Sequence, residues 1–173
     1  MLIGSFLNVV IYRLPKMMEQ QWAAELAQLE AEKQGKEPPA GAQAPFNLMT
    51  PRSRCPSCGH VVQWHENVPV LSYLFLRGRC SACKAPISAR YPMVELLTGA
   101  LFFFGIDRWG VSPAGFAWCG FSAALVALAF IDWDTTLLPD DITLPLLWAG
   151  LLSAAFQWTN VPLHASVTGA AAG

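Results

Sequence analysis

The chain has 173 residues, of which 54% are hydrophobic and 13% are charged, with a formal net charge of −1. Average soluble chains carry about 25% charged residues, so the composition argues against an ordinary soluble domain and indicates a membrane protein. The charges are segregated, because all lysines and arginines except Arg108 lie between Arg13 and Arg90.

The apolar runs predict several membrane-spanning helices. Residues 1–12 are too short to span alone, since a spanning helix needs roughly 20 residues, and no basic region precedes them as in a signal peptide. We therefore expect residues 1–14 to be part of a first transmembrane helix, in a chain that is cut at both ends. A transmembrane domain is predicted at 92–173, with spans at about 92–107, 113–131 and 142–158 and the start of another at 161–173.

The basic residues predict the orientation. Cytoplasmic loops are enriched in lysine and arginine, and the segment between the first and second predicted spans holds nearly all of them. We expect residues 15–91 to form a cytoplasmic insert. Counting crossings from there places 132–141 on the same side of the membrane.

The insert is predicted to have two parts joined by a linker. Residues 17–35 are rich in helix formers and end at Gly35, a suitable helix stop. They form either a surface helix or a helix lying on the bilayer. The linker at 36–45, KEPPAGAQAP, has too much proline and glycine for regular structure.

Two Cys-x-x-Cys pairs in the second part of the insert predict a metal site. Tight turns at Pro56, Gly59 and Gly78 favour convergence of four thiolates on one tetrahedral zinc ion. Two disulfides are the alternative, which a reducing cytoplasm disfavours. His60 and His65 are possible substitute ligands, but four sulfur ligands leave no open position, so the zinc is expected to be structural. The predicted ligands are Cys55, Cys58, Cys80 and Cys83.

Four aspartates interrupt the apolar sequence between the third and fourth predicted spans, at positions 132, 134, 140 and 141. Asp140 and Asp141 suit the start of a helix, whose dipole favours anions. A calcium loop is excluded, because Thr136 and Leu137 stand where an oxygen ligand and glycine are needed. The remaining interpretation is that one aspartate belongs to an aspartyl protease dyad, in which two carboxylates share a proton and activate water.

The acidic stretch does not supply both members of such a dyad. Asp132 and Asp134 are two residues apart and point to different faces of a helix, and Pro139 forces a turn between the two groups of aspartates. A partner must come from another helix. Glu95 is a candidate, although its place in the first turn of a span also fits a structural role.

Five segments occur in an order that resembles the bacterial type IV prepilin peptidases over most of the chain. They are GSFLNVVIYRLP, PRSRCPSCG, WHENVPVLSYLFLRGRC, ISARYPMVELLTG and DWDTTLLPDDITLPLLWAGLL. The family's first catalytic aspartate precedes seven residues that end in a hydrophobic-Pro pair, followed by Asp or Asn, which matches Asp132 and Asp140. The resemblance therefore implies that Asp132 is catalytic, with Asp134, Asp140 and Glu95 as possible supporting residues. The second family aspartate lies in a Gly-x-Gly-Asp motif, which this sequence lacks.

The resemblance also implies an all-α polytopic membrane protein with a small cytoplasmic zinc-ribbon-like insert. Such enzymes reside in the bacterial inner membrane, with insert and active site facing the cytoplasm. They cleave the leaders of prepilins and pseudopilins, then methylate the new N-terminus with S-adenosylmethionine. The expected partners are the N-terminal segments of those substrates and the lipid bilayer, with no nucleic acid.

Two other functions stay open. One is a truncated, non-catalytic, zinc-stabilised membrane module that binds prepilins, and the other is a methyltransferase without protease activity. Because the second aspartate is absent from this sequence, we expect the 173-residue chain to be inactive as a protease.

Overall fold

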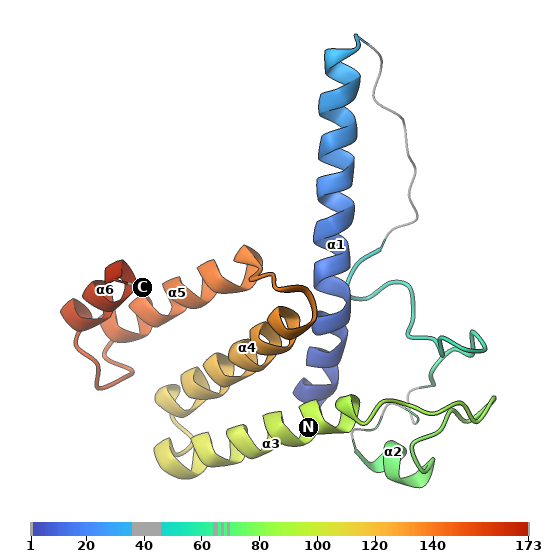
Figure 1. Cartoon of the computed structure of the whole chain (residues 1–173). Helices are drawn as coiled ribbons and strands as arrows, with labels where there is room; N and C mark the ends of the chain where they lie inside the picture. Colours follow the sequence, from blue (N-terminus) through green and yellow to red (C-terminus); the bar gives the residue numbers. More distant parts are fainter. Residues whose placement is uncertain (1, 36–45, 64–65, 67, 69, 173) are drawn as a thin grey trace.

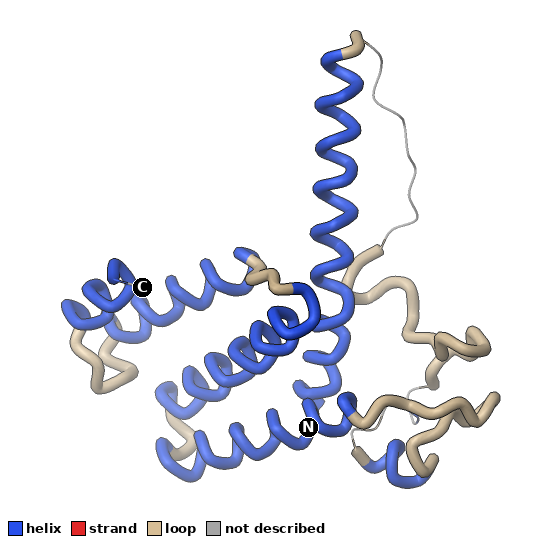
Figure 2. The backbone as a smooth tube through the Cα atoms, in the orientation of Figure 1, coloured by secondary structure: helices blue, strands red, loops and turns tan. Residues whose placement is uncertain are grey.

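The structure is a computed structural model that describes residues 2–35, 46–63, 66, 68 and 70–172. Within these ranges the regular structure is helical (Figures 1 and 2), and the backbone forms two isolated bridges in place of strands, Arg54 with Val61 and Arg79 with Pro86. The helices are α1 (Leu2–Lys33), α2 (Leu71–Phe75), α3 (Arg90–Trp109), α4 (Pro113–Thr135), α5 (Asp140–Ala155) and α6 (Leu163–Ala172). The predicted linker at 36–45 and the predicted alternative ligand His65 lie outside the described residues.

Helix α1 joins two segments that the sequence predicts separately. The apolar start of the chain and the predicted helix at 17–35 form one continuous helix that contains Pro15. Good helix formers follow the proline, so the helix resumes after the lost hydrogen bond. The predicted stop is nearly right, since α1 ends at Lys33 and Gly35 has a left-handed φ of +63°.

Helix α4 has clear start and stop signals. The Ser112 side chain accepts a hydrogen bond from the Gly115 N–H at 3.1 Å, and Pro113 occupies the first turn. At the other end Thr136 adopts a left-handed conformation with φ of +54°, and its N–H donates to the Asp132 carbonyl. These features extend α4 four residues past the predicted end at 131 and place Asp132 in its last turn.

The core lies where α1 crosses the beginning of α3 and the end of α4 (Figure 1). Beyond this crossing the second half of α1 extends past the other helices. Gly4 permits the close contact, because a Cβ at this position would lie 2.7 Å from the Glu95 Cα. The buried apolar residues of this core are Leu7, Val10, Ile11, Leu14, Val94, Val126, Ala127 and Ile131.

Among the described helices, α4 alone is long and apolar enough to cross a membrane, with a mean hydropathy of 2.0. The predicted span at 92–107 lies in α3, which also carries four charged residues at 90, 95, 107 and 108. The span predicted at 142–158 corresponds to α5, which has 16 residues. Helix α6 within 161–173 has 10 residues.

Candidate metal centre and acidic site

Four cysteine sulfurs form a compact cluster. All four Sγ atoms lie within 4.8 Å of one another. The cross-pair distances are 3.8 Å between Cys55 and Cys83 and 4.0 Å between Cys58 and Cys80. Sulfurs bound at about 2.3 Å to a tetrahedral zinc ion lie about 3.8 Å apart. The donor set therefore fits one tetrahedral, thiophilic ion.

The two cysteine pairs have equivalent backbone conformations. The Gly59 N–H donates to the Cys55 carbonyl at 2.9 Å, and the Lys84 N–H donates to the Cys80 carbonyl at 3.1 Å. Gly59 and Lys84 each follow the second cysteine of a pair, and both have positive φ, +72° and +60°. An isolated bridge closes each turn. The predicted tight turns are thus present in both pairs, which we call the two knuckles.

Backbone N–H groups and crowding of the sulfurs shift the thiol pKa values in opposite directions. The N–H groups of Ser57 and Cys58 lower the pKa of Cys55 to about 6. The pKa of Cys80 is also lowered, first by the Cys83 N–H. The His60 N–H lowers the pKa of Cys58, but the neighbouring thiols and desolvation outweigh it and raise the value to about 12. Four thiolates at these distances repel one another, and a dication removes that repulsion.

A polar network missed by the sequence analysis connects the knuckles beside the sulfurs. His60 Nε2 lies 3.1 Å from Glu66 Oε2 and 3.3 Å from the Ser81 hydroxyl. The Gln63 N–H donates to the same Glu66 oxygen at 2.8 Å, and it is the main reason that the pKa of Glu66 is lowered to about 2. His60 thus contacts Glu66 and Ser81 and is not part of the sulfur cluster. In the sequence, the signal for this network was the position of His60, Glu66 and Ser81 close to the cysteine pairs.

The acidic stretch joins the end of α4 to the start of α5. Asp132 is exposed in the last turn of α4 and makes no ion pair with another described residue. Asp140 is the first residue of α5, as predicted, and accepts a hydrogen bond from the Thr143 hydroxyl at 3.3 Å. Asp141 is exposed beside it. Trp133, next to Asp132, is 86% exposed.

Asp134 has an ion-pair partner that the sequence analysis did not identify. The Arg90 guanidinium approaches both Asp134 carboxylate oxygens at 2.7 Å, donates to the Phe130 carbonyl at 3.2 Å and lies over the Phe130 ring. Helices α3 and α4 are antiparallel neighbours, so the start of one meets the end of the other. In the sequence, the signal for this pair was a basic residue just before one predicted span and an acidic residue just after the next. The pairing gives Asp134 a structural partner.

Glu95 is hydrogen-bonded to the insert, and it forms no ion pair with a described residue. Its side chain is buried in the first turns of α3, and its Oε2 accepts a hydrogen bond from the Val70 N–H at 2.7 Å. Of the residues proposed to support Asp132, the structure therefore engages Asp134 with Arg90, Glu95 with the insert, and Asp140 with its own helix.

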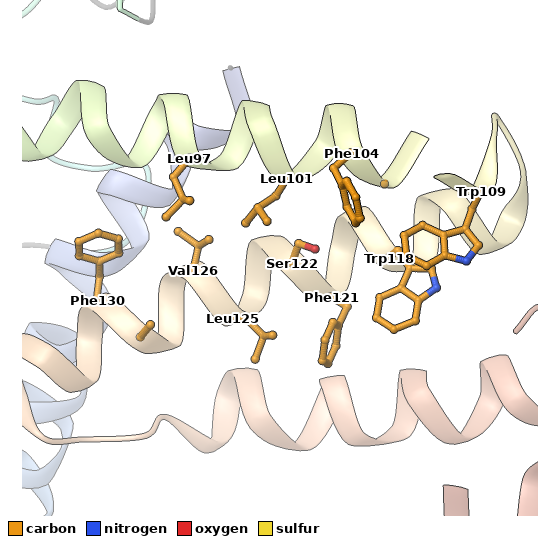
Figure 3. Close-up of a pocket in the computed structure, with 12 residues that line it drawn as sticks. Leu97, Leu101, Phe104, Trp109, Trp118, Phe121, Ser122, Leu125, Val126 and Phe130 are labelled. Carbon is orange, nitrogen blue, oxygen red and sulfur yellow. The ribbon is translucent and has the colours of Figure 1, made fainter. Parts of the chain in front are cut away.

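A cavity of about 360 Å³ lies between α3 and α4 (Figure 3). Trp109 and Trp118 stack at one end, with ring centroids 4.9 Å apart, and Phe130 lies at the other end, two residues before Asp132. Leucine, phenylalanine and tryptophan side chains dominate the lining, with Ser122 as a polar exception. Such a lining suits an apolar occupant and supplies no acid–base chemistry.

Comparison with known proteins matches both halves of the chain to one family. Residues 1–109 match the Bacterial Peptidase A24 N-terminal domain, and residues 119–173 match the Type IV leader peptidase family. No solved structure matches the chain.

Curated relatives carry the same name, prepilin leader peptidase/N-methyltransferase. The protein from Burkholderia pseudomallei strain K96243 is 49% identical over 173 residues, which is 100% of this chain and 55% of the relative. The Aeromonas hydrophila protein is 51% identical over 158 residues, 88% of this chain and 51% of the relative. The Pseudomonas aeruginosa protein is 47% identical over 156 residues, 90% and 52% respectively. The chain thus spans about half the length of these relatives, and it belongs to the bacterial peptidase A24 family of type IV leader peptidases.

Proposed function

We propose that this chain provides Asp132 and the zinc-binding insert of a membrane aspartyl endopeptidase that removes the leaders of type IV prepilins and pseudopilins. The observation that carries this proposal is the position of Asp132. It is an exposed carboxylate in the last turn of α4, the described helix that is apolar enough to cross a membrane. A carboxylate at such a boundary meets both bulk water and a peptide bond next to an apolar helix.

The proposed chemistry is general acid–base activation of water. Asp132 and a second carboxylate share one proton, so that one takes a proton from water and the other protonates the leaving amine. The second carboxylate is proposed to lie outside residues 1–173, because no Gly-x-Gly-Asp motif occurs in the sequence and Glu95, the internal candidate, is engaged with Val70. On this proposal the 173-residue chain alone does not cleave.

The proposal includes N-methylation of the new N-terminus with S-adenosylmethionine as donor. Its support is the name of the curated relatives, which includes N-methyltransferase. No residue of this chain is assigned to that cofactor.

We propose zinc as the ion held by the four cysteines, in a structural role. The support is the distance set, which suits four bonds of about 2.3 Å, and the size of the insert, which has little core of its own. Metal analysis of purified protein is expected to give one zinc per chain, and simultaneous Cys55→Ser and Cys80→Ser replacement is expected to abolish it. Protein without zinc whose four thiols are oxidised when fresh would contradict the assignment.

A multi-pass arrangement in the inner membrane is proposed, with the insert and the acidic stretch in the cytoplasm. Large apolar side chains on α3, α4 and α5 are exposed, including Phe103, Phe116 and Trp148 at 75%, 62% and 62%. Extensive exposed apolar surface indicates a membrane or protein environment. Thiol labelling of single cysteines at Glu30 and Asp141 is expected to report the cytoplasm, with Val111 on the other side as control. Labelling of Glu30 or Asp141 from outside would contradict this orientation.

Asp132→Asn in the longer protein tests the catalytic assignment. Asparagine keeps the shape of the side chain but cannot exchange a proton, and loss of general acid–base catalysis is worth on the order of 10²–10⁴-fold. Cleavage of a synthetic prepilin in detergent should therefore be abolished. Asp141→Asn is the matched control and should cost little, because Asp141 lies in the first turn of α5. Full activity of Asp132→Asn would make Asp140 the next candidate.

A non-catalytic, zinc-stabilised module that binds prepilins is the second candidate function. It is favoured by the engagement of Glu95, the internal candidate for the second carboxylate, with the Val70 N–H. Prepilin binding by the 173-residue chain that is unaffected by Asp132→Asn, together with full cleavage by the longer protein carrying the same change, would support it.

A further inference from the structure

Two buried charged side chains hold the knuckles to the helical core, and both do so through backbone groups. Arg13 of α1 and Glu95 of α3 are each 7% exposed. Neither forms an ion pair within the described part of the chain. Burying a charge is costly unless hydrogen bonds compensate, so the partners of these two side chains indicate what their burial achieves.

Arg13 binds the segment that leads into the first knuckle. Its Nη1 donates to the Asn47 carbonyl at 2.8 Å and its Nη2 to the Pro51 carbonyl at 2.5 Å. The Asn47 side chain in turn accepts from the Met49 and Thr50 N–H groups, which folds this segment into a turn with both carbonyls directed at one guanidinium. The contact fixes the chain four residues before Cys55.

Glu95 binds the segment that leads into the second knuckle. Its Oε2 accepts from the Val70 N–H at 2.7 Å, immediately before α2. Val70 has a φ of +57°, a conformation that is unfavourable for a β-branched residue. The hydrogen bond from the Val70 N–H to the carboxylate compensates for that cost.

We infer that Arg13 and Glu95 are positioning residues that fix the two knuckles against the core that also carries Asp132. Val94 and Ile131, the neighbours of Glu95 and Asp132, belong to the same buried cluster. Glu95 then acts as a hydrogen-bond acceptor and not as a proton donor or the second carboxylate. The inference rests on the proposed function in one respect: the position of the knuckles relative to Asp132 matters for activity only if Asp132 is catalytic.

Matched substitutions at Glu95 separate these roles. Glu95→Gln keeps an acceptor oxygen for the Val70 N–H but cannot exchange a proton, whereas Glu95→Leu removes the acceptor. In zinc-loaded 173-residue chain in detergent, hydrogen exchange of the peptide containing Val70 should accelerate on the order of ten- to a hundredfold in Glu95→Leu, because the Val70 N–H is left without an acceptor. Glu95→Gln should stay within about threefold of the unchanged protein.

Arg13 provides an independent test on the other knuckle. Arg13→Met should accelerate exchange of the Met49 and Thr50 N–H groups and leave the Val70 peptide unchanged. Arg13→Lys should give an intermediate result, because an ammonium group cannot reproduce the planar fork that reaches two carbonyls. Exchange within α4 serves as the folding control in all variants.

Several results would overturn the inference. These are equal exchange in Glu95→Gln and Glu95→Leu, unchanged exchange in Glu95→Leu, or acceleration spread evenly over both knuckles. If Glu95→Leu does not fold, the Gln and Arg13 variants decide. In the longer protein, Glu95→Gln should retain more leader cleavage than Glu95→Leu. Loss of cleavage in Glu95→Gln with normal exchange would instead assign proton chemistry to Glu95. Full cleavage by Asp132→Asn would refute the proposed function and leave the exchange result standing.

Discussion

Replacing Gly59 with alanine should weaken metal binding by a predictable amount. Gly59 has a φ of +72°, and a Cβ at this position would meet no atom within 4 Å. The cost is therefore conformational, about 1–2 kcal/mol for an L residue in the left-handed region. Lower entropy of the unfolded chain returns about 0.4–1 kcal/mol. The net destabilisation of the first knuckle is about 1 kcal/mol.

Two other positions in the knuckles calibrate this effect. Lys84 occupies the equivalent place in the second knuckle and already has a φ of +60° without being glycine. Lys84→Ala should therefore change stability by less than about 0.5 kcal/mol. Gly78 has a φ of +66°, and its Cβ would lie 2.8 Å from the Tyr73 hydroxyl oxygen. Gly78→Ala should cost more than Gly59→Ala, because a steric clash is added.

Competition with a coloured zinc chelator measures the series. Because metal binding and folding of a small metal domain share one free energy, about 1 kcal/mol corresponds to roughly fivefold weaker zinc affinity for Gly59→Ala. Zinc affinity is predicted to be highest for Lys84→Ala, lower for Gly59→Ala and lowest for Gly78→Ala. Equal affinities for Gly59→Ala and Lys84→Ala would refute the conformational reasoning.

Three further predictions concern the core, the pair of helices α3 and α4, and the polar network. Gly4→Ala should lower the unfolding temperature in detergent, because its Cβ would lie 2.7 Å from the Glu95 Cα. Gly120→Ala meets no atom and should be neutral or stabilising, so equal effects of the two changes would contradict the close contact. Asp134→Asn should cost under about 1 kcal/mol in thermal unfolding, because the ion pair is partly exposed. Arg90→Ala should cost more, because it also loses the Phe130 contacts, and the reverse order would argue against this pairing. An NMR titration of the Glu66 carboxyl should give a pKa of about 2, below the usual value of 4.5. The stabilisation of the fold by this carboxylate should therefore be complete above pH 4.5 and be lost as the pH falls through 2. A pKa at the usual value would refute the network.

Local patterns in the sequence predicted the parts of the molecule that depend on nearby residues. The cysteine spacing and the turn-prone residues around it predicted a cluster that the structure places within 4.8 Å. The start of α5 at Asp140 also followed from residues next to it. In both cases, a few neighbouring side chains and backbone groups determine the outcome.

Contacts between distant segments were not predictable in the same way. The Arg90–Asp134 pair joins residues 44 apart and the Glu95–Val70 bond joins residues 25 apart. Both depend on how α1, α3 and α4 pack, which periodicity alone does not specify. Separate elements were also predicted at 1–14 and 17–35, whereas α1 is one continuous helix through Pro15, because good helix formers follow the proline.

Cleavage of a synthetic prepilin by the 173-residue chain, alongside the longer protein, tests the central claim most directly. The claim is that Asp132 is one of two catalytic carboxylates and that the other lies outside residues 1–173. The longer protein should release the leader, and the 173-residue chain, zinc-loaded and in the same detergent, should release none. Cleavage by the 173-residue chain, lost on Asp132→Asn, would place both carboxylates within this sequence and contradict the account.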